Sequence, residues 1–303
     1  MRLSRMRTVT SGLCALSLGL CLAVSGCGPS AEDAPSPAAT TAAAPLVEIS
    51  GTGGQAPVFT YTPPLVVEEP LTEVVWEGDG EPVADNQPVL LSIYSENGTD
   101  ATVVRDDFAA VPQPYLLTPE AIGSDLYTAL SGQTVGTRLL HVVETDSTPL
   151  VMSIDILPSR ATGEPRTPGA GLPTVALDET GAPTVTVPAG ALPPTSPVVQ
   201  QLIRGTGEQV TAGQKVVIQF VAVKWSTGEV FDTTWGADLL PETVTLGADQ
   251  LIEGFDEGLV DLPVGSQVML VVPPGLGFGP SGNDLSAETL VYVVDILAVS
   301  PPA

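Results

Sequence analysis

The chain contains two copies of one sequence pattern, and this repeat constrains its fold more than any other feature. The segment GDGEPVADNQPVLLSI, from Gly78, aligns without gaps on GTGEQVTAGQKVVIQF, from Gly205, with six identities in sixteen positions. Three further pairs occur in matching order: APVFTYTPP (from Ala56) with APTVTVPAG (from Ala182), VGTRLLHVV (from Val135) with VGSQVMLVV (from Val264), and PLVMSIDIL (from Pro149) with TLVYVVDIL (from Thr289). A convergent β pattern would explain any single match, whereas four in one order predict two copies of one fold.

Apolar residues alternate with a period of two, which is typical of half-buried β-strands. In VVIQFVA the alternation predicts one inward face made of Val216, Ile218, Phe220 and Ala222. In the last strand it predicts a second inward face made of Leu290, Tyr292, Val294 and Ile296. One short helix is expected at 254–260, with Asp256 and Glu257 in its first turn, where acidic residues suit the helix dipole. The fold class is therefore α+β and mainly antiparallel.

Composition divides the chain after residue 26 into a tether, two domain-sized blocks and a linker, and residues 1–26 form a fifth segment. Residues 27–45 are Ala, Pro, Thr and Ser with a few acids, which predicts a flexible tether. Residues 159–173 (SRATGEPRTPGAGLP) predict a linker. The two blocks on either side, 46–158 and 174–303, each have a common domain size.

The N-terminus reads as a targeting segment. Arg2, Arg5 and Arg7 precede an apolar run to Val24, and Val-Ser-Gly-Cys closes it at Cys27. This ending resembles the lipobox of bacterial lipoproteins, which implies a signal peptide at 1–26 and a lipid on Cys27. The run is shorter than about 20 residues and contains Ser, Thr and Gly, which favours a signal peptide over the alternative of one transmembrane anchor. We therefore expect the protein outside the cytoplasm, anchored to the outer face of the cell membrane through Cys27.

Cysteine usage limits the covalent chemistry. Cys14 and Cys21 lie inside the predicted signal peptide, so a mature chain keeps only Cys27. This excludes a disulfide or a thiolate metal site within one mature chain.

Charge excludes one class of partner. The net charge is −25, and loss of the three arginines of the signal peptide would deepen it to −28. Nucleic-acid binding needs phosphate neutralisation, so no nucleic-acid partner is expected. The same sign should keep the protein body off an anionic membrane, which leaves the lipid as the only membrane contact. Low lysine with high Ala, Gly, Val and Pro is similar to exported proteins of actinobacteria.

The last third carries ordered motifs: STGEVFDTTWG from Ser226, LGADQLIEGFDEGLVDLPVGSQVMLVVPPGLGFG from Leu246, and AETLVYVVDIL from Ala287. This order and spacing resemble the FKBP-type peptidyl-prolyl cis-trans isomerases. The resemblance implies, for each copy, a curved antiparallel sheet wrapped around one short helix. It also implies a pocket that needs no cofactor and no metal.

The resemblance also implies site residues. The catalytic set is Phe220, Phe231, Asp232, Ile252 and Phe278, and the substrate-binding set is Leu251, Phe255, Leu285 and Tyr292. The apolar walls would favour a twisted X-Pro amide, and the Ile252 N–H would hold a substrate carbonyl. The alternative is that these aromatic residues only form the core between sheet and helix.

Departures from the family pattern reduce the expected activity. Phe220 and Phe278 stand where the family has tyrosines. The family arginine maps to Ala237 or Asp238, and an aromatic position maps to Glu242. Because an unpaired carboxylate in an apolar site is costly, Asp232 should find Thr233, Thr234, water or solvent.

The first copy departs further from the pattern. It carries VVRDDF in place of the Phe-Asp doublet (Phe231 and Asp232) and Leu126 in place of the helix aromatic (Phe255). The segment VVETDSTP replaces VPPGLGFG, the segment from Val272 that we call the flap. We expect a degenerate domain without a pocket.

These observations predict a weak prolyl isomerase that acts on proline-containing exported polypeptides and is open to macrolide inhibitors. The alternative is a non-catalytic module, which binds proline peptides or acts as a chaperone on duplicated folds. The retained flap and Phe-Asp doublet favour the enzyme, and the missing Tyr and Arg favour the binder.

Overall fold

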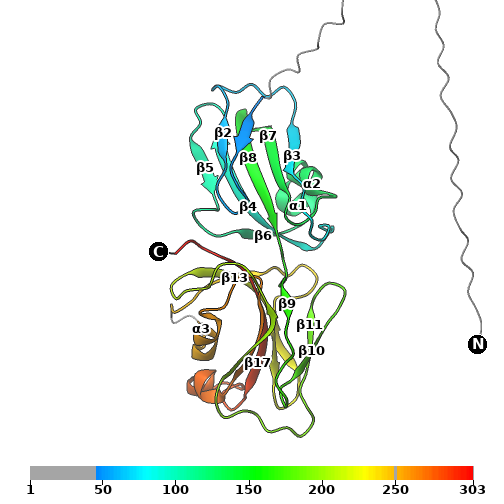
Figure 1. Ribbon diagram of the computed structural model, residues 1–303, viewed down its shortest axis with the longest axis vertical. Coiled ribbons are helices and arrows are strands. Elements are labelled where there is room, and N and C mark those ends of the chain that lie inside the picture. The colour runs from blue at the N-terminus through cyan, green and yellow to red at the C-terminus, as the bar shows by residue number, and fades with distance from the viewer. Residues whose placement is uncertain (1–45, 249–250, 303) are drawn as a thin grey trace, which may run out of the picture. The chain divides into compact units, whose positions relative to one another are not determined.

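The computed structural model describes residues 46–248 and 251–302, and Figure 1 shows them as a coloured ribbon. The predicted signal peptide, the tether and Cys27 lie outside these residues. Within the described ranges, no helix is long and apolar enough to cross a membrane.

The N-terminal half, residues 46–158, is built on an antiparallel six-stranded sheet. Its order is β3 (Leu71–Trp76), β7 (Arg138–Thr145), β8 (Thr148–Leu157), β4 (Pro88–Asn97) and β5 (Val103–Asp106), with β6 (Gln113–Leu116) also paired to β4. A separate hairpin, β1 (Glu48–Ser50) and β2 (Val58–Thr60), precedes the sheet.

The C-terminal half, residues 159–302, is built on an antiparallel seven-stranded sheet. Its order is β14 (Val230–Thr233), β13 (Lys215–Lys224), β17 (Leu290–Val299), β16 (Gln267–Val272), β12 (Val198–Arg204) and β9 (Glu164–Pro165), with β15 (Glu242–Thr245) also paired to β13. Here too a separate hairpin, β10 (Thr174–Leu177) and β11 (Pro183–Thr186), precedes the main strands.

The two sheets have the same topology. Strands β3, β7, β8, β4, β5 and β6 take the places of β12, β16, β17, β13, β14 and β15. The repeated sequence pairs fall on these matching strands and on β2 and β11 of the two hairpins. The expected α+β architecture of antiparallel sheets with few helices is therefore present in both halves.

Matching glycines explain why the repeated motif begins with Gly. A Cβ on Gly78 would lie 2.2 Å from the carbonyl oxygen of Val135, and one on Gly205 would lie 2.1 Å from that of Val264. No side chain fits at such a distance, so both positions require glycine for close backbone approach. The same contact therefore pins the start of each copy to the turn before β7 or β16.

Each sheet buries apolar residues on both faces. On β13, Phe220 and Ala222 pack with helix α3 (Glu253–Leu259), whereas Val221 and Val223 pack on the opposite face with residues of β10–β11. Figure 1 shows α3 and this hairpin on opposite sides of the sheet. The predicted alternation is thus confirmed, since all eight residues expected to face inward on β13 and β17 belong to the cluster under α3. The hairpin covering the outer face was not predicted.

Three details correct the expectations. The N-terminal half has two short helices rather than one, α1 (Pro119–Ile122) and α2 (Ser124–Leu130). They are separate because Gly123, at φ 82°, interrupts the helical path. Helix α3 begins at Glu253, one residue earlier than expected, so its first-turn acids are Glu253 and Asp256 rather than Asp256 and Glu257. Two single-turn 3₁₀ helices, η1 (Pro274–Leu276) and η2 (Gly279–Ser281), shape the flap.

The segment predicted as a linker is tied to the second sheet. Strand β9 pairs with β12, and the Thr162 N–H donates to the Gly265 carbonyl at 2.9 Å. The Ala161 N–H donates to the Asp295 carboxylate at 2.7 Å. The ordered structure of the C-terminal half therefore begins near residue 161, before the predicted boundary at 174.

Candidate functional site

A bulge in the β13–β14 pairing positions the Phe-Asp doublet. Ala222 lies opposite Asp232 and Val223 lies opposite Val230, so Phe231 has no cross-strand partner of its own. A bulge of this kind breaks the strict alternation of side chains. Phe231 therefore packs on the inner cluster although its neighbour Asp232 lies opposite the inward residue Ala222.

Four aromatic rings from four elements meet under α3. The ring centroid of Tyr292 on β17 lies 5.3 Å from that of Phe255 on α3 and 6.0 Å from that of Phe231 on β14, and both pairs meet edge to face. Phe220 on β13 lies 6.2 Å from Tyr292 and 6.4 Å from Phe255. Such geometries stabilise aromatic pairs beyond their area burial, so the cluster is a rigid apolar wall.

Two glycines allow α3 to approach the sheet closely. A Cβ on Gly254 would lie 2.5 Å from Val272, and one on Gly258 would lie 2.7 Å from Leu270. These glycines are four residues apart and therefore share one helix face. The close approach fixes Phe255, between them in sequence, against the floor of the aromatic cluster.

The residues before α3 supply an apolar wall and a backbone donor. Leu251 and Ile252 are half-buried against the cluster. Ile252 caps the helix at φ −69° and ψ 144°, and its carbonyl accepts the Phe255 N–H at 2.9 Å. Its own N–H has no acceptor among the residues that the structure describes. A donor at the edge of an apolar site is thus open to a ligand carbonyl.

The flap after β16 covers one side of the cluster. Leu276, Phe278 and Leu285 are half-buried and pack against it. A Cβ on Gly279 would lie 2.4 Å from the Pro274 carbonyl oxygen, so the tight fold of the flap requires glycine there. Leu276 was not predicted as a site residue, although its place inside the quoted PPGLGFG motif is the signal that would have found it.

Asp232 has no partner among the described residues. Its carboxylate is exposed, and the threonines expected to bind it are engaged elsewhere. The Thr233 hydroxyl donates to the Phe220 carbonyl at 3.0 Å, and the Thr234 hydroxyl accepts the Phe220 N–H at 2.8 Å. Solvent is therefore what stabilises this charge.

Tyr292 is the one cluster residue with a polar atom. Burial, and then the nearby charge of Asp232, raise the pKa of the Tyr292 hydroxyl well above its usual range. The phenol is therefore protonated at neutral pH. Among the described residues the hydroxyl has no hydrogen-bond partner, so it remains available to a ligand.

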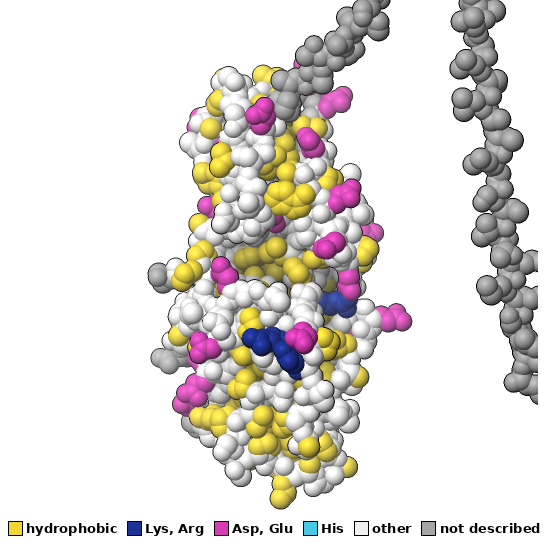
Figure 2. Space-filling view, viewed as in Figure 1, with side chains coloured by type: hydrophobic (Ala, Val, Ile, Leu, Met, Phe, Trp, Pro, Cys, Tyr) yellow, Lys and Arg dark blue, Asp and Glu magenta, His cyan; other side chains and the backbone are white. Residues whose placement is uncertain are grey.

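The structure thus brings the nine predicted residues of the C-terminal half to one place. Eight are apolar or aromatic members of a single cluster, and Asp232 lies beside it on β14. The positions to which the family's arginine and second aromatic residue map lie outside this cluster, since Ala237, Asp238 and Glu242 are exposed. No group of acidic, histidine or cysteine residues suited to a metal occurs in the described part of the chain, and Figure 2 shows acidic side chains scattered over the visible face.

The same positions in the N-terminal half hold different residues. The shared register places Ile93, Arg105 and Met152 where the other half has Phe220, Asp232 and Tyr292. Leu126 occupies the place of Phe255 on the helix. The aromatic wall is therefore absent from this half.

Comparison with known proteins agrees with this geometry. The family described as FKBP-type peptidyl-prolyl cis-trans isomerase matches residues 206–297. A protein named FK506-binding protein from Streptomyces anulatus is 36% identical over 121 residues, which are 39% of this chain and 96% of the relative. The chain belongs to the FKBP-type peptidyl-prolyl isomerase family.

Two further proteins are similar to part of this chain. A probable FK506-binding protein of Corynebacterium glutamicum is 33% identical over 118 residues, 38% of this chain and 97% of that protein. The crystal structure of FkpA from Escherichia coli is 27% identical, with a TM-score of 0.32, over 44% of this chain and 53% of that chain. The FKBP-family match lies wholly within the C-terminal half, where the aromatic cluster is.

Proposed function

We propose that the C-terminal half is a weak peptidyl-prolyl cis-trans isomerase. The observation that carries this proposal is the combination of four packed aromatic rings with the N–H of Ile252, which has no acceptor among the described residues. The barrier to rotation about a peptide bond is about 18–20 kcal/mol, and it comes from amide resonance. A group that favours the twisted amide over the planar one therefore accelerates isomerisation.

The walls and the donor have separate tasks in this mechanism. A twisted X-Pro amide loses resonance and charge separation, so apolar walls favour it relative to the planar ground state. The N–H of Ile252 donates to the carbonyl on the far side of proline and holds the substrate while the bond rotates. No proton transfer and no covalent intermediate are required.

The expected activity is low because Phe220 and Phe278 carry no hydroxyl. One neutral hydrogen bond contributes about 0.5–1.5 kcal/mol net, which is up to roughly tenfold in rate. Losing two donors thus costs up to two orders of magnitude, while the aromatic wall and the backbone donor are retained.

The test is a prolyl-isomerisation assay on residues 45–303, with Xaa-Pro peptides and with the macrolide FK506. The relatives carry FK506 binding in their names, and the apolar cluster suits such a ligand. We expect catalysis above the buffer rate that FK506 inhibits. A rate equal to buffer, together with saturable peptide binding, would instead identify the second candidate, a non-catalytic proline-binding or chaperone module. The specific observation that favours this candidate is the unpartnered, exposed Asp232.

We further propose that the N-terminal half, 46–158, is a degenerate duplicate of the C-terminal one. The shared strand order and the paired glycines Gly78 and Gly205 support duplication. The aliphatic residues at the aromatic positions support loss of the pocket. We expect no saturable binding of an Xaa-Pro peptide by a chain in which Ile252→Asp blocks the C-terminal pocket.

We also propose that the protein is lipid-anchored outside the cytoplasm and acts on exported polypeptides that contain proline. The support is the sequence Val24-Ser25-Gly26-Cys27 after a basic and apolar leader. The acidic charge of the protein body leaves the lipid as the proposed membrane contact.

A further inference from the structure

A short segment between the hairpin and β12 exposes one leucine almost completely. Strand β11 ends at Thr186 and β12 begins at Val198. We call residues 187–194 (VPAGALPP) the strap. Leu192 in this strap is 90% exposed, the highest value among the exposed large hydrophobic residues of the described chain. A leucine side chain that leaves water when a partner covers it contributes favourably to the free energy of association.

Leu192 is also followed by proline. The described residues contain five Leu-Pro pairs, and the leucines of the other four are half-buried: Leu157, Leu172, Leu240 and Leu262. Only Leu192-Pro193 has both members exposed and open to another molecule. Among the described residues, Leu192-Pro193 is therefore the one Leu-Pro pair that is accessible at both positions.

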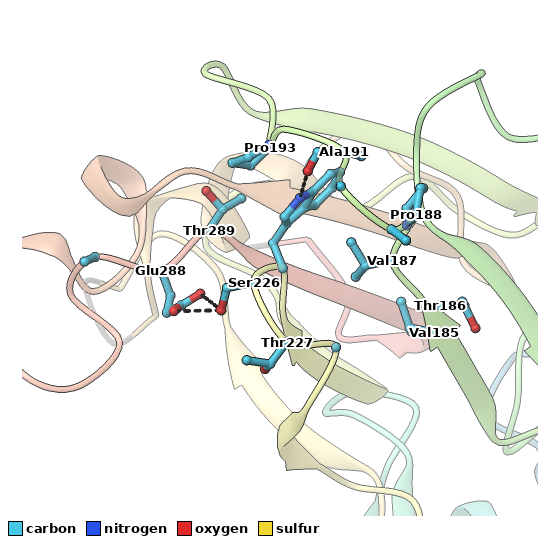
Figure 3. Close-up of a pocket in the computed structure, with 15 residues that line it drawn as sticks. Val185, Thr186, Val187, Pro188, Ala191, Pro193, Ser226, Thr227, Glu288 and Thr289 are labelled. Carbon is cyan, nitrogen blue, oxygen red and sulfur yellow. Dashed lines mark hydrogen bonds between the residues drawn. The ribbon is translucent and has the colours of Figure 1, made fainter.

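The strap is held in place directly before this pair. The Trp225 indole N–H donates to the Ala191 carbonyl at 3.0 Å, and Val187 and Ala191 pack on the outer apolar cluster. Figure 3 shows this hydrogen bond, with Pro193 beside Ala191. Residues of the strap line an open pocket with a volume of about 650 Å³. An anchored segment loses less conformational entropy on binding than a free one.

The strap cannot reach the pocket of its own molecule. On β13, Phe220 and Ala222 face the aromatic cluster, whereas Val221 and Val223 face the outer cluster on which the strap lies. The sheet itself separates the two sites. Any pairing between strap and pocket must therefore join two molecules.

We propose that Leu192-Pro193 of one molecule docks in the proline pocket of a second copy of this chain. The inference rests on the proposed proline-binding function. Leu192 would leave water and pack against the apolar wall of the pocket. The Pro193 carbonyl would accept a hydrogen bond from the N–H of Ile252. Because the two surfaces differ, the contact is heterologous, and its repetition makes head-to-tail rings or chains. The self-docked form would also occupy the pocket and compete with other substrates.

Sedimentation velocity on residues 45–303, a single compact unit, tests this proposal over a wide range of concentrations. We expect the unaltered chain to form concentration-dependent oligomers. Leu192→Ser should weaken association at least about tenfold, because a leucine no longer leaves water. The matched control is Leu177→Ser, since Leu177 is 47% exposed on the adjacent hairpin but precedes no proline; it should leave association unchanged.

Mixing two variants separates strap–pocket docking from other association. Leu192→Ser has an intact pocket and no strap ligand, whereas Ile252→Asp has an intact strap and a blocked pocket. Each alone should be monomeric, and an equimolar mixture should form a one-to-one complex that does not extend. If Ile252→Asp does not fold, Phe278→Glu at the half-buried flap replaces it. A monomeric unaltered chain, or oligomers that survive Leu192→Ser, would overturn the proposal.

The outcome is distinguishable from failure of the proposed function. Leu192→Ser should isomerise and bind a free Xaa-Pro peptide as well as, or better than, the unaltered chain. Normal peptide isomerisation without self-association would refute only the docking. Absence of peptide binding in both chains would refute the proline pocket itself.

Discussion

Phe255 on α3 and Tyr292 on β17 meet edge to face, with ring centroids 5.3 Å apart. This contact joins the only helix of the C-terminal sheet's inner face to the central part of that sheet, within the residues that the structure describes. Phe255 is 4% exposed and Tyr292 is 6% exposed, so both side chains belong to the packed core. Tests of function should therefore use substitutions that preserve this packing.

The first prediction isolates the backbone donor. Ile252→Pro removes its N–H, and the φ of −69° at this position already suits proline. We expect the chain to fold and kcat/KM to fall by up to about tenfold, the effect of one neutral hydrogen bond. The measurement is peptide isomerisation, with Ile252→Val as the control that keeps the N–H. Equal rates for both variants would show that this donor has no part in catalysis.

The second prediction concerns the hydroxyl of Tyr292. Removing it with Tyr292→Phe keeps the ring and its packing, so we expect unchanged stability and a fall in kcat/KM of up to about tenfold. In the double variant Phe220→Tyr with Tyr292→Phe, the hydroxyl moves to the neighbouring ring 6.2 Å away and should restore part of the loss. The raised pKa of Tyr292 also predicts no change in this effect between pH 7 and pH 9. An unchanged kcat/KM in Tyr292→Phe would contradict a role of this hydroxyl in catalysis.

The third prediction concerns the pH dependence of stability. Burial raises the pKa of Asp295 to about 6, although the Ala161 N–H, the Gln267 amide and the charge of Arg160 oppose the shift. Between about pH 4 and pH 6 the folded chain therefore binds a proton that the unfolded chain releases. The contribution of Asp295 to the free energy of unfolding should fall as pH rises through this window, by roughly 2–3 kcal/mol at most, and be flat above it.

Asp295→Asn is the control for this effect, because it removes the titration and keeps the shape. Denaturant unfolding of both chains at several pH values gives the difference that belongs to Asp295. The free energy of unfolding of the asparagine variant, relative to that of the unaltered chain, should increase from pH 4 to pH 6. A difference that is constant with pH would contradict the raised pKa.

The fourth prediction compares matching positions in the two sheets. Arg138 is fully buried and pairs with Asp155, whereas Gln267 occupies the corresponding place beside Asp295. Arg138→Gln should destabilise the N-terminal half by about 3–5 kcal/mol, because it leaves a buried carboxylate without its cation. Adding Asp155→Asn should recover much of the loss. Urea unfolding measures the stability of the single variant and of the double variant. An Arg138→Gln chain as stable as the original chain would contradict the prediction.

The fifth prediction concerns Cys27. Stable anchoring needs two or more acyl chains, which a lipoprotein modification at this residue would supply. Cys27→Ala should release the protein from membranes after a salt wash, as measured by fractionation. A variant that still fractionates with membranes would show that the anchor lies elsewhere.

The sequence by itself determined the repeat and the β periodicity, and the resemblance of its motifs implied the members of the aromatic cluster. These features depend on local rules: alternation on β13 and β17 fixes which residues face inward, and the paired glycines mark turns that no side chain fits. The ordered motifs from Ser226 to Leu297 then implied the pocket, and all eight of its predicted apolar residues gather under α3.

Only the tertiary structure decided what lies on the other face of the sheet and where polar groups find partners. Periodicity shows that Val221 and Val223 face away from Phe220, but it does not show that the hairpin β10–β11 and the strap cover them. Likewise, no local pattern joins Ala161 to Asp295, 134 residues later. Nor does the local sequence show that Leu192 is exposed, whereas the four other leucines that precede proline are half-buried. Burial depends on segments far apart in sequence, and for that reason local sequence rules do not contain it.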